Sequence, residues 1–154
     1  MTKTIFLRIT LWMIVGVALL FSTLLGVQII TAENQLLIEM YIAAAVFWID
    51  VLLAIWIALI LHKMLRLIDK KEIFTETTLH LLHTIQKLTL SISIVSIGLM
   101  PLFVKAAHLD DAPGLVLFGL GILSIPFAVF VFVSVLKELM HQAVNIQKEN
   151  ELTI

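Results

Sequence analysis

Four long apolar stretches divide the chain, and short polar segments separate them. The stretches cover residues 9–32, 40–61, 88–104 and 114–136. Because about 20 consecutive apolar residues form a helix that crosses the hydrocarbon core of a bilayer, each stretch predicts a transmembrane helix. The third stretch is the shortest, and the lysines at its two ends can extend to the headgroups. The pattern therefore predicts an all-α polytopic membrane protein, with residues 1–154 forming a single four-span domain built as a bundle of four transmembrane helices.

The helical pattern continues beyond the apolar stretches on one side of the membrane. Residues 62–68 mix apolar and charged side chains, and Thr75 fits the N-cap of a helix that runs on into the third stretch. An amphipathic pattern also follows the fourth stretch. We therefore predict a helical hairpin over residues 62–87 and a C-terminal helix and tail over residues 137–154.

Basic residues are distributed unequally between the two sides of the membrane. Nine of the ten lysines and arginines lie before the first stretch, between the second and third, or after the fourth. These nine are Lys3, Arg8, Lys63, Arg66, Lys70, Lys71, Lys87, Lys137 and Lys148. The positive-inside rule then places both termini, the hairpin and the C-terminal helix in the cytoplasm. These cytoplasmic helical extensions either complete the bundle or form a docking surface for a cytoplasmic protein, and the pattern leaves both interpretations open.

Composition agrees with a chain surrounded by lipid and narrows the chemistry. Hydrophobic residues make up 61% of the chain and charged residues 14%, whereas soluble domains are about 45–50% apolar and about 25% charged. The formal net charge of −1 argues against direct nucleic-acid binding. The absence of cysteine excludes disulfides, thiolate nucleophiles and cysteine metal sites. No nucleophile–base pattern or phosphate-binding glycine loop stands out, so we expect neither catalytic residues nor a cofactor, and the protein is not predicted to be an enzyme.

Two of the predicted cytoplasmic segments resemble a known family. They are the middle-loop residues LRLI (65–68) and IFT (73–75), and the ending IQKENELTI (146–154). These segments are similar to the loop and the acidic tail of the bacterial Domain of Unknown Function 2975 family (YoaS-like membrane proteins), and the resemblance covers essentially the whole chain. It implies a multi-pass protein of the bacterial cell (inner or cytoplasmic) membrane without an assigned biochemical activity.

The same resemblance suggests a partner. Members of the family are often encoded beside a small helix-turn-helix regulator, which implies a membrane-linked regulatory role and a cytoplasmic regulator as partner. We therefore expect the docking surface to be formed by residues of the two resembling segments, namely Leu65, Arg66, Phe74, Thr75, Asn150, Leu152, Thr153 and Ile154.

Asp50 is the most unusual residue of the apolar stretches. It lies in the middle of residues 40–61, which carry no other charge, and a carboxylate at that depth costs about 2.5–3.5 kcal/mol on insertion scales. Ser96 and Ser124 fall at similar depth and are its natural hydrogen-bond partners. Because no lysine or arginine lies at that depth and desolvation disfavours the charged form, we expect a protonated Asp50 that holds helices together. A proton- or cation-linked role and a contact within a homo-oligomer stay open as alternatives.

Histidines and prolines give weaker signals. His80 and His83 are three residues apart on the predicted helix, a spacing that can place two metal ligands on one face. Without cysteine or an H-E-x-x-H pattern the metal signal is weak, and we interpret both as interfacial histidines. Pro101 and Pro126 lie inside the third and fourth stretches, where proline can kink a helix.

The polar connection before the fourth stretch suits the start of a helix. Asp111 fits the cap of that helix, and Pro113 fits its first turn.

Two classes of function follow from these features. The first is a non-enzymatic regulatory or interaction protein that docks a cytoplasmic partner through residues 65–85 and the tail. The second is a small oligomeric transporter or channel that uses the carboxyl of Asp50 in its path, which requires several subunits because four helices leave little room for a pore.

Overall fold

The protein is almost entirely helical. The structure, a computed structural model, describes residues 2–31, 38–70 and 75–151. Within these ranges the elements are α1 (Thr2–Thr31), α2 (Ile38–Asp69), α3 (Glu76–Val95), the 3₁₀ turn η1 (Ser96–Leu99), α4 (Met100–Leu109) and α5 (Gly114–Glu151). Four helical segments are long and apolar enough to cross a membrane, and they run over Ile5–Thr31, Ile38–Asp69, Glu76–Leu109 and Gly114–Glu149. The prediction of an all-α protein with four transmembrane helices is confirmed.

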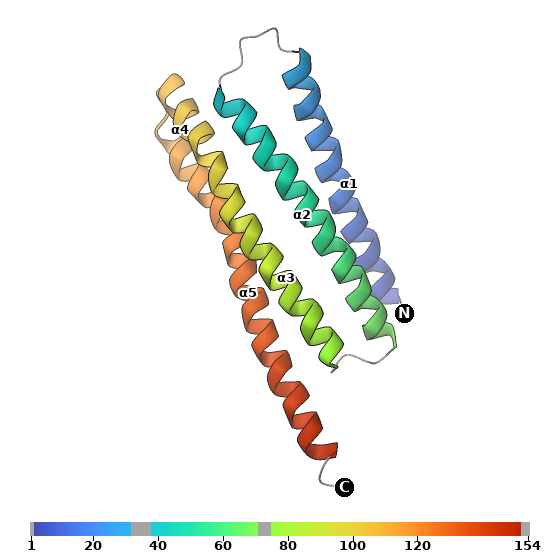
Figure 1. The fold of residues 1–154 in the computed structure, drawn as a ribbon. Coiled ribbons are helices and arrows are strands. Elements are labelled where there is room, and N and C mark those ends of the chain that lie inside the picture. Colours follow the sequence, from blue (N-terminus) through green and yellow to red (C-terminus); the bar gives the residue numbers. More distant parts are fainter. Residues whose placement is uncertain (1, 32–37, 71–74, 152–154) are drawn as a thin grey trace.

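The helices are arranged as a row in which each packs on its neighbours in sequence. In the described part of the chain, α1 contacts only α2, α2 also contacts α3, η1 and α4, and α5 contacts α3, η1 and α4. Figure 1 shows α1 and α2 as one antiparallel pair beside a second pair formed by α3–α4 and α5. The bundle is therefore open along one side, with α1 and α5 as its two edges.

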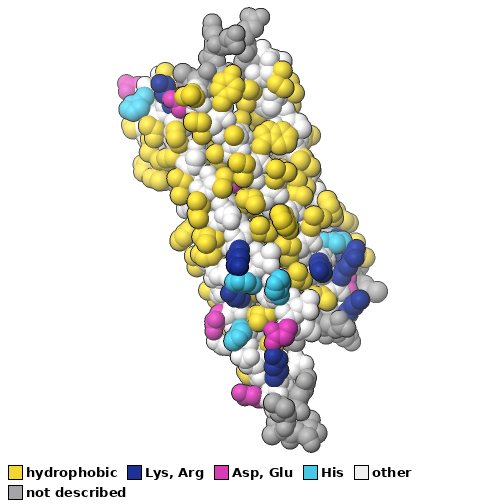
Figure 2. All heavy atoms as spheres, viewed as in Figure 1, with side chains coloured by type: hydrophobic (Ala, Val, Ile, Leu, Met, Phe, Trp, Pro, Cys, Tyr) yellow, Lys and Arg dark blue, Asp and Glu magenta, His cyan; other side chains and the backbone are white. Residues whose placement is uncertain are grey.

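One end of the molecule carries most of the charge. The start of α1, the end of α2, the start of α3 and the end of α5 all lie at the lower end in Figure 1. We call this the basic end, and its described Lys and Arg side chains are Arg8, Lys63, Arg66, Lys70, Lys87, Lys137 and Lys148. Figure 2 shows dark blue and cyan side chains gathered there, below a broad apolar band.

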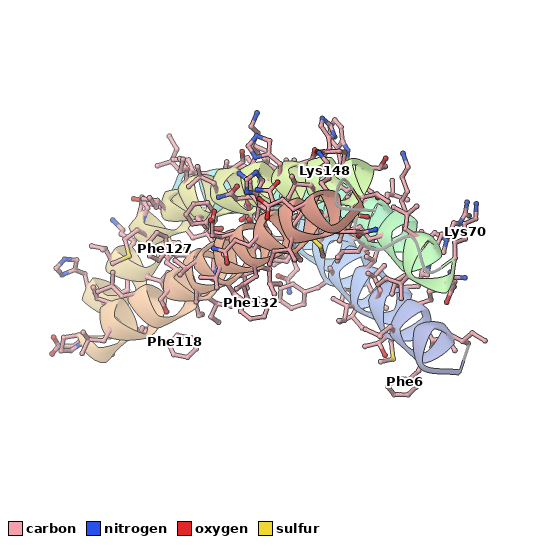
Figure 3. The ribbon with its side chains drawn as sticks, turned by 90° about the horizontal axis from the view of Figure 1, so that it is seen from below. Phe6, Lys70, Phe118, Phe127, Phe132 and Lys148 are labelled. Carbon is pink, nitrogen blue, oxygen red and sulfur yellow. The ribbon has the colours of Figure 1, made fainter. Side chains whose placement is uncertain are left out.

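The surface of the apolar band is that of a protein surrounded by hydrocarbon. Seen from below in Figure 3, Phe118, Phe127 and Phe132 project from α5, and Phe6 projects from α1. Between 56% and 73% of each of these residues is exposed. Soluble monomers rarely expose continuous apolar patches of more than a few hundred Å², so this band faces lipid and the protein is a multi-pass membrane protein.

A small core lies where α2, α3 and α5 meet. Its buried residues are Ile60, Leu81, Leu82, Ile85 and Val133. Partly buried Met64 and Met140 pack against it, and both follow the apolar stretches in the sequence. The core therefore reaches past the apolar stretches, because helical continuation keeps apolar side chains on the inner face.

The predicted helical continuations are present. Helix α2 runs on from the apolar stretch to Asp69, and α5 runs on to Glu151. Thr75 is the N-cap of α3, as predicted, and its side chain accepts a hydrogen bond from the backbone N–H of Thr78. The tail residues 152–154 lie outside the described residues, as does the connection 71–74.

The third transmembrane segment is divided by a 3₁₀ turn. Helix α3 ends at Val95, η1 covers Ser96–Leu99, and α4 begins at Met100 with Pro101 in its first turn. Proline has no N–H to donate and its ring crowds the carbonyl four residues earlier, which here belongs to Ile97. The backbone N–H of Met100 bonds the carbonyl of Ile97, the spacing of a 3₁₀ helix. Pro101 therefore acts by tightening the turn that precedes it.

The corner between α4 and α5 corrects one detail of the sequence interpretation. Asp111 has φ of 50°, the left-handed region that aspartate tolerates better than most residues. The backbone N–H of Ala112 bonds the carbonyl of Ala107 at 3.0 Å, which closes the end of α4 as a Schellman motif. Asp111 thus ends α4, whereas the sequence suggested that it caps α5. Pro113 directly precedes α5, which begins at Gly114, and its carbonyl accepts a hydrogen bond from the N–H of Val116 at 3.2 Å.

Candidate functional site

Asp50 and Ser96 are brought together in the middle of the membrane segment. The hydroxyl of Ser96 donates to Oδ2 of Asp50 at 2.8 Å. Ser96 is 5% exposed, and Oδ1 of Asp50 is buried without a hydrogen-bond partner among the described residues. The contact joins α2 to η1, so one predicted partner of Asp50 is at hydrogen-bond distance and half of the carboxyl group is left without a protein partner.

The 3₁₀ turn allows this close approach. A Cβ added at Gly98 would lie 2.7 Å from Cγ2 of Val46, which is far inside ordinary contact distance. Val46 lies one helical turn from Asp50 on α2, and Gly98 and Ser96 both belong to η1. The Gly98–Val46 approach is therefore next to the Ser96–Asp50 contact. Because residue 98 is a glycine without a Cβ, the backbone of η1 can lie close to α2, and the short side chain of Ser96 can reach Asp50.

Ser124 is not part of this contact. It is exposed, and its hydroxyl donates to the carbonyl of Gly121 at 2.6 Å. A serine in a membrane helix can satisfy its hydroxyl within its own helix, so similar depth in the bilayer did not make Ser124 a partner of Asp50.

Within the described residues, none of the ion pairs involves Asp50. The two that the structure contains are Arg8 with Asp69, at 2.7 Å, and Lys148 with Glu76. They join α1 to α2 and α3 to α5 at the basic end. The Asp50–Ser96 pair is thus a hydrogen bond between a hydroxyl and a carboxyl oxygen, and neither ion pair of the described residues reaches it.

The residues predicted to dock a partner have different environments. Leu65 is 8% exposed and belongs to the helix interface, whereas Arg66 is exposed. Thr75 is engaged in capping α3. Asn150 lies in α5, and its side chain is not among those described. The remaining predicted docking residues, Phe74, Leu152, Thr153 and Ile154, lie outside the described residues.

A second polar site, which the sequence interpretation missed, joins α3 to α5. The ammonium of Lys137 lies 2.9 Å from Nδ1 of His83 and donates to Oε1 of Gln86 at 2.9 Å. The amide nitrogen of Gln86 donates to the hydroxyl of Ser134 at 2.9 Å, and that hydroxyl donates to the carbonyl of Phe130 at 2.8 Å. We call His83, Gln86, Ser134 and Lys137 the polar ladder.

Spacing along the two helices offered a signal for the polar ladder. His83 and Gln86 are three residues apart on α3, and Ser134 and Lys137 are three residues apart on α5. Residues three apart lie on the same face of a helix, so each pair forms one polar strip. The sequence alone does not show that the two strips face each other.

The two histidines that were weak metal candidates have different surroundings. Nδ1 of His83 lies 2.9 Å from the ammonium of Lys137, a group that donates hydrogen bonds and does not accept them. His80 is exposed on the same helix. Among the described residues, no group of three or more His, Asp or Glu side chains is placed to hold a metal ion.

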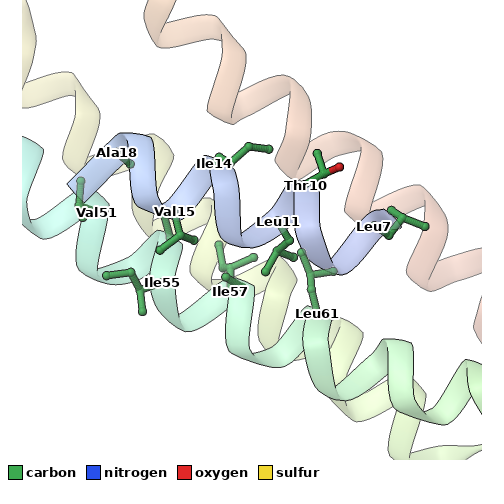
Figure 4. Close-up of a pocket in the computed structure, with 12 residues that line it drawn as sticks. Leu7, Thr10, Leu11, Ile14, Val15, Ala18, Val51, Ile55, Ile57 and Leu61 are labelled. Atoms are coloured by element: carbon green, nitrogen blue, oxygen red, sulfur yellow. The ribbon is translucent and has the colours of Figure 1, made fainter. Parts of the chain in front are cut away.

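Two grooves at membrane depth are apolar. One, of about 300 Å³, runs between α1 and α2, where Leu11, Val15 and Ile55 face each other in Figure 4. The other, of about 440 Å³, lies near the far end and has Phe21, Phe103 and Phe118 in its wall. Their linings suit hydrocarbon and carry no ionisable side chain, so neither has the chemistry of a reactive site.

Comparison with known proteins identifies the family. Residues 28–154 match the family described as "Protein of unknown function (DUF2975)". The chain belongs to this family. It is also 31% identical to the "Uncharacterized membrane protein YoaS" of Bacillus subtilis (strain 168), over 164 aligned positions that cover 99% of this chain and 98% of the relative. No solved structure matches the chain.

The family match contains both polar sites. Asp50, Ser96 and the polar ladder all lie within residues 28–154, whereas most of α1 precedes the matched segment. The resemblance proposed from the loop and tail sequences is confirmed, and with it the assignment to a family of membrane proteins whose biochemical activity is not known.

Proposed function

We propose that this protein is a non-enzymatic regulatory or interaction protein that docks a cytoplasmic partner at its basic end. The observation that carries the proposal is that α2, α3 and α5 continue as helices past their apolar stretches at this end. The Glu76–Lys148 pair joins the continuations of α3 and α5, and the Arg8–Asp69 pair joins the continuation of α2 to the start of α1. An ordered polar structure of this kind offers a fixed surface to a protein in the adjoining aqueous phase.

The proposed orientation places the basic end in the cytoplasm of a bacterial cell. Seven described Lys and Arg side chains lie at this end, and Lys105 lies near the other. Under the positive-inside rule this asymmetry favours cytoplasmic termini in the cell membrane.

Orientation has a direct test because the chain has no cysteine. Single cysteines at Lys148 and Asp110 are labelled in intact cells with a membrane-impermeant maleimide. The proposal expects labelling of Asp110→Cys and protection of Lys148→Cys until the cells are opened. The reverse pattern would place the basic end outside and exclude a cytoplasmic partner.

The expected partner is the helix-turn-helix regulator that the family resemblance implies. Full-length protein in detergent and a variant without residues 146–154 are immobilised, and the purified regulator encoded beside the gene is passed over both. Arg66→Glu tests the α2 surface, because Arg66 is exposed, and Lys105→Glu at the opposite end is the matched control. Binding that is lost in the shortened protein and weakened by Arg66→Glu supports docking. Equal binding by all four proteins, or by none, contradicts it.

A second candidate function is supported by the buried Oδ1 of Asp50. A carboxyl oxygen without a protein partner beside a 3₁₀ turn is suited to bind a proton or small cation. The corresponding function is transport or channel activity by a homo-oligomer. Flux of protons or monovalent cations into liposomes is measured for wild type and Asp50→Asn. Flux that the substitution removes supports this candidate, and absence of flux from the wild type excludes it.

A further inference from the structure

A pocket at the basic end opens between α3 and α5. It has a volume of about 330 Å³ and is lined by Glu76, Leu79, His80, His83 and Lys137. The α3 residues share one face of that helix, since Leu79 and His80 each lie three or four positions from both Glu76 and His83. Lys137 reaches the pocket from α5. The pocket therefore has a fixed cation on one side and imidazole groups on the other.

Lys137 is held in place by neutral groups. Its ammonium has three N–H donors, and two of them are directed to His83 Nδ1 and Gln86 Oε1. Neither ion pair in the described part of the chain includes Lys137. Its positive charge is thus positioned by hydrogen bonds but not neutralised by a carboxylate, and one donor is left for a further acceptor.

The carboxylate that lines the pocket is already paired. Glu76 accepts a hydrogen bond from the ammonium of Lys148, which lies near the C-terminal end of α5. This pairing offsets the negative charge at the rim, where His80 is exposed and has ring nitrogens that can hydrogen-bond a ligand. The electrostatic balance of the pocket therefore favours an anion.

The depth of the pocket indicates the kind of anion. Lys137 is the first charged residue after residues 114–136, and Lys87 is the last before residues 88–104. Figure 2 shows Lys and His side chains gathered just below the apolar band. Phosphate groups of phospholipids lie at this level, and basic pockets between transmembrane helices bind lipid headgroups.

We propose that this pocket binds a phosphate group, with Lys137 as its principal ligand and His80 at its rim, and that an anionic phospholipid of the surrounding membrane supplies the phosphate. The phosphate ligands proposed here, Lys137 and His80, differ from the Arg66 surface proposed for the protein partner, and Lys148 contributes only by pairing with Glu76. No bond is made or broken. The lipid would fill the groove between α3 and α5 at the membrane surface.

Lipid binding to the full-length protein in detergent tests this proposal. Purified protein is incubated with phosphatidylglycerol, with phosphatidylcholine or with inorganic phosphate, and bound ligand is measured by native mass spectrometry alongside the thermal shift. We expect at least about fivefold more phosphatidylglycerol than phosphatidylcholine on the wild type, as an anionic headgroup next to unpaired basic charge predicts. Lys137→Gln should remove that preference, and Lys105→Gln, at the opposite end, is the matched control.

A second variant guards against misfolding, because Lys137 also belongs to the polar ladder. His80→Glu changes an exposed residue and keeps Lys137 with its hydrogen bonds, but it adds a carboxylate that competes for the ammonium. It should also reduce phosphatidylglycerol binding severalfold. Stabilisation by inorganic phosphate alone, lost in both variants, would still support a phosphate site and would assign its source to a soluble ligand. Wild-type retention in both variants, or no binding of either phosphate source to the wild type, overturns the proposal.

Discussion

The Asp50–Ser96 contact and the polar ladder are two ways of placing polar groups in one membrane protein. Asp50 is prominent in the sequence, yet it makes one hydrogen bond in the structure. The ladder residues attract little notice in the sequence, yet they form a connected series between α3 and α5. The two sites differ in their depth in the membrane. Polar groups are costly at mid-membrane, so few are available there to bond Asp50, whereas polar side chains near the membrane surface are frequent enough to form a hydrogen-bonded network.

The largest expected loss in free energy of unfolding comes from a substitution that separates α2 from η1 at mid-membrane. Gly98→Ala places a Cβ 2.7 Å from Val46 and must displace a stiff β-branched side chain. Overpacking of this kind costs about 1–3 kcal/mol in free energy of unfolding, and it should also lengthen the Asp50–Ser96 contact. The free energy of unfolding is measured by unfolding the protein in mixed detergent micelles. Gly121→Ala is the control, since nothing lies within 4 Å of a Cβ there, and equal losses in the two variants would contradict the close packing of η1.

Breaking the polar ladder should have the next largest effect. Gln86→Leu removes the side chain that bonds both Lys137 and Ser134. Leaving the Lys137 ammonium with fewer partners should lower the free energy of unfolding by about 1–2 kcal/mol, in the range for hydrogen bonds to charged groups.

The control for the ladder is Gln142→Leu, which changes an exposed glutamine of the same helix α5 that bonds only within that helix. The same unfolding assay applies. A loss for Gln142→Leu as large as that for Gln86→Leu would mean that the ladder adds nothing particular between α3 and α5.

Removing the hydroxyl that contacts Asp50 should have a smaller effect. Ser96→Ala deletes the 2.8 Å hydrogen bond to Oδ2 of Asp50, and interhelical hydrogen bonds in membranes contribute about 0.6 kcal/mol on average. Asp50→Asn keeps an acceptor for Ser96 and should unfold close to wild type. Severe loss of folded protein with Asp50→Asn would contradict the expectation of a protonated, helix-bonding carboxyl.

The smallest effect is expected at the edge of the row. Arg8→Gln removes the ion pair with Asp69, whose side chains are 29% and 30% exposed. Partly exposed pairs typically contribute about 0.2–1 kcal/mol and weaken with salt. The difference between Arg8→Gln and wild type should therefore shrink as salt is raised from low to molar concentration. A difference that does not depend on salt would indicate a packing role for Arg8, one nitrogen of which is buried.

Local signals were enough to predict most of the fold. The four transmembrane segments follow from runs of apolar residues. The cap of α3 by Thr75 follows from a threonine placed directly before an amphipathic helical pattern. Neither inference depends on how helices are placed relative to each other. The open row of helices was not predictable in this way, because lipid-facing and helix-facing apolar residues look alike in sequence.

The candidate sites were harder to predict because they depend on rotation about helix axes. Ser96 and Ser124 lie at similar depth, and only the 3₁₀ turn at Ser96–Leu99 turns one of them toward Asp50. The polar ladder requires two strips on α3 and α5 to face each other, which neither strip specifies alone. The depth of a residue in the membrane can be inferred from its position in the sequence. The direction in which its side chain faces depends on how the helices pack.

The row arrangement also bears on how the protein is made. Helix α1 contacts only α2 among the described residues, and α5 contacts elements that precede it. Each helix entering the membrane during synthesis therefore meets its partner already inserted beside it, and no helix must wait for a distant one before it can pack. Assembly can follow the order of translation, since most of these contacts join transmembrane segments that follow one another along the chain.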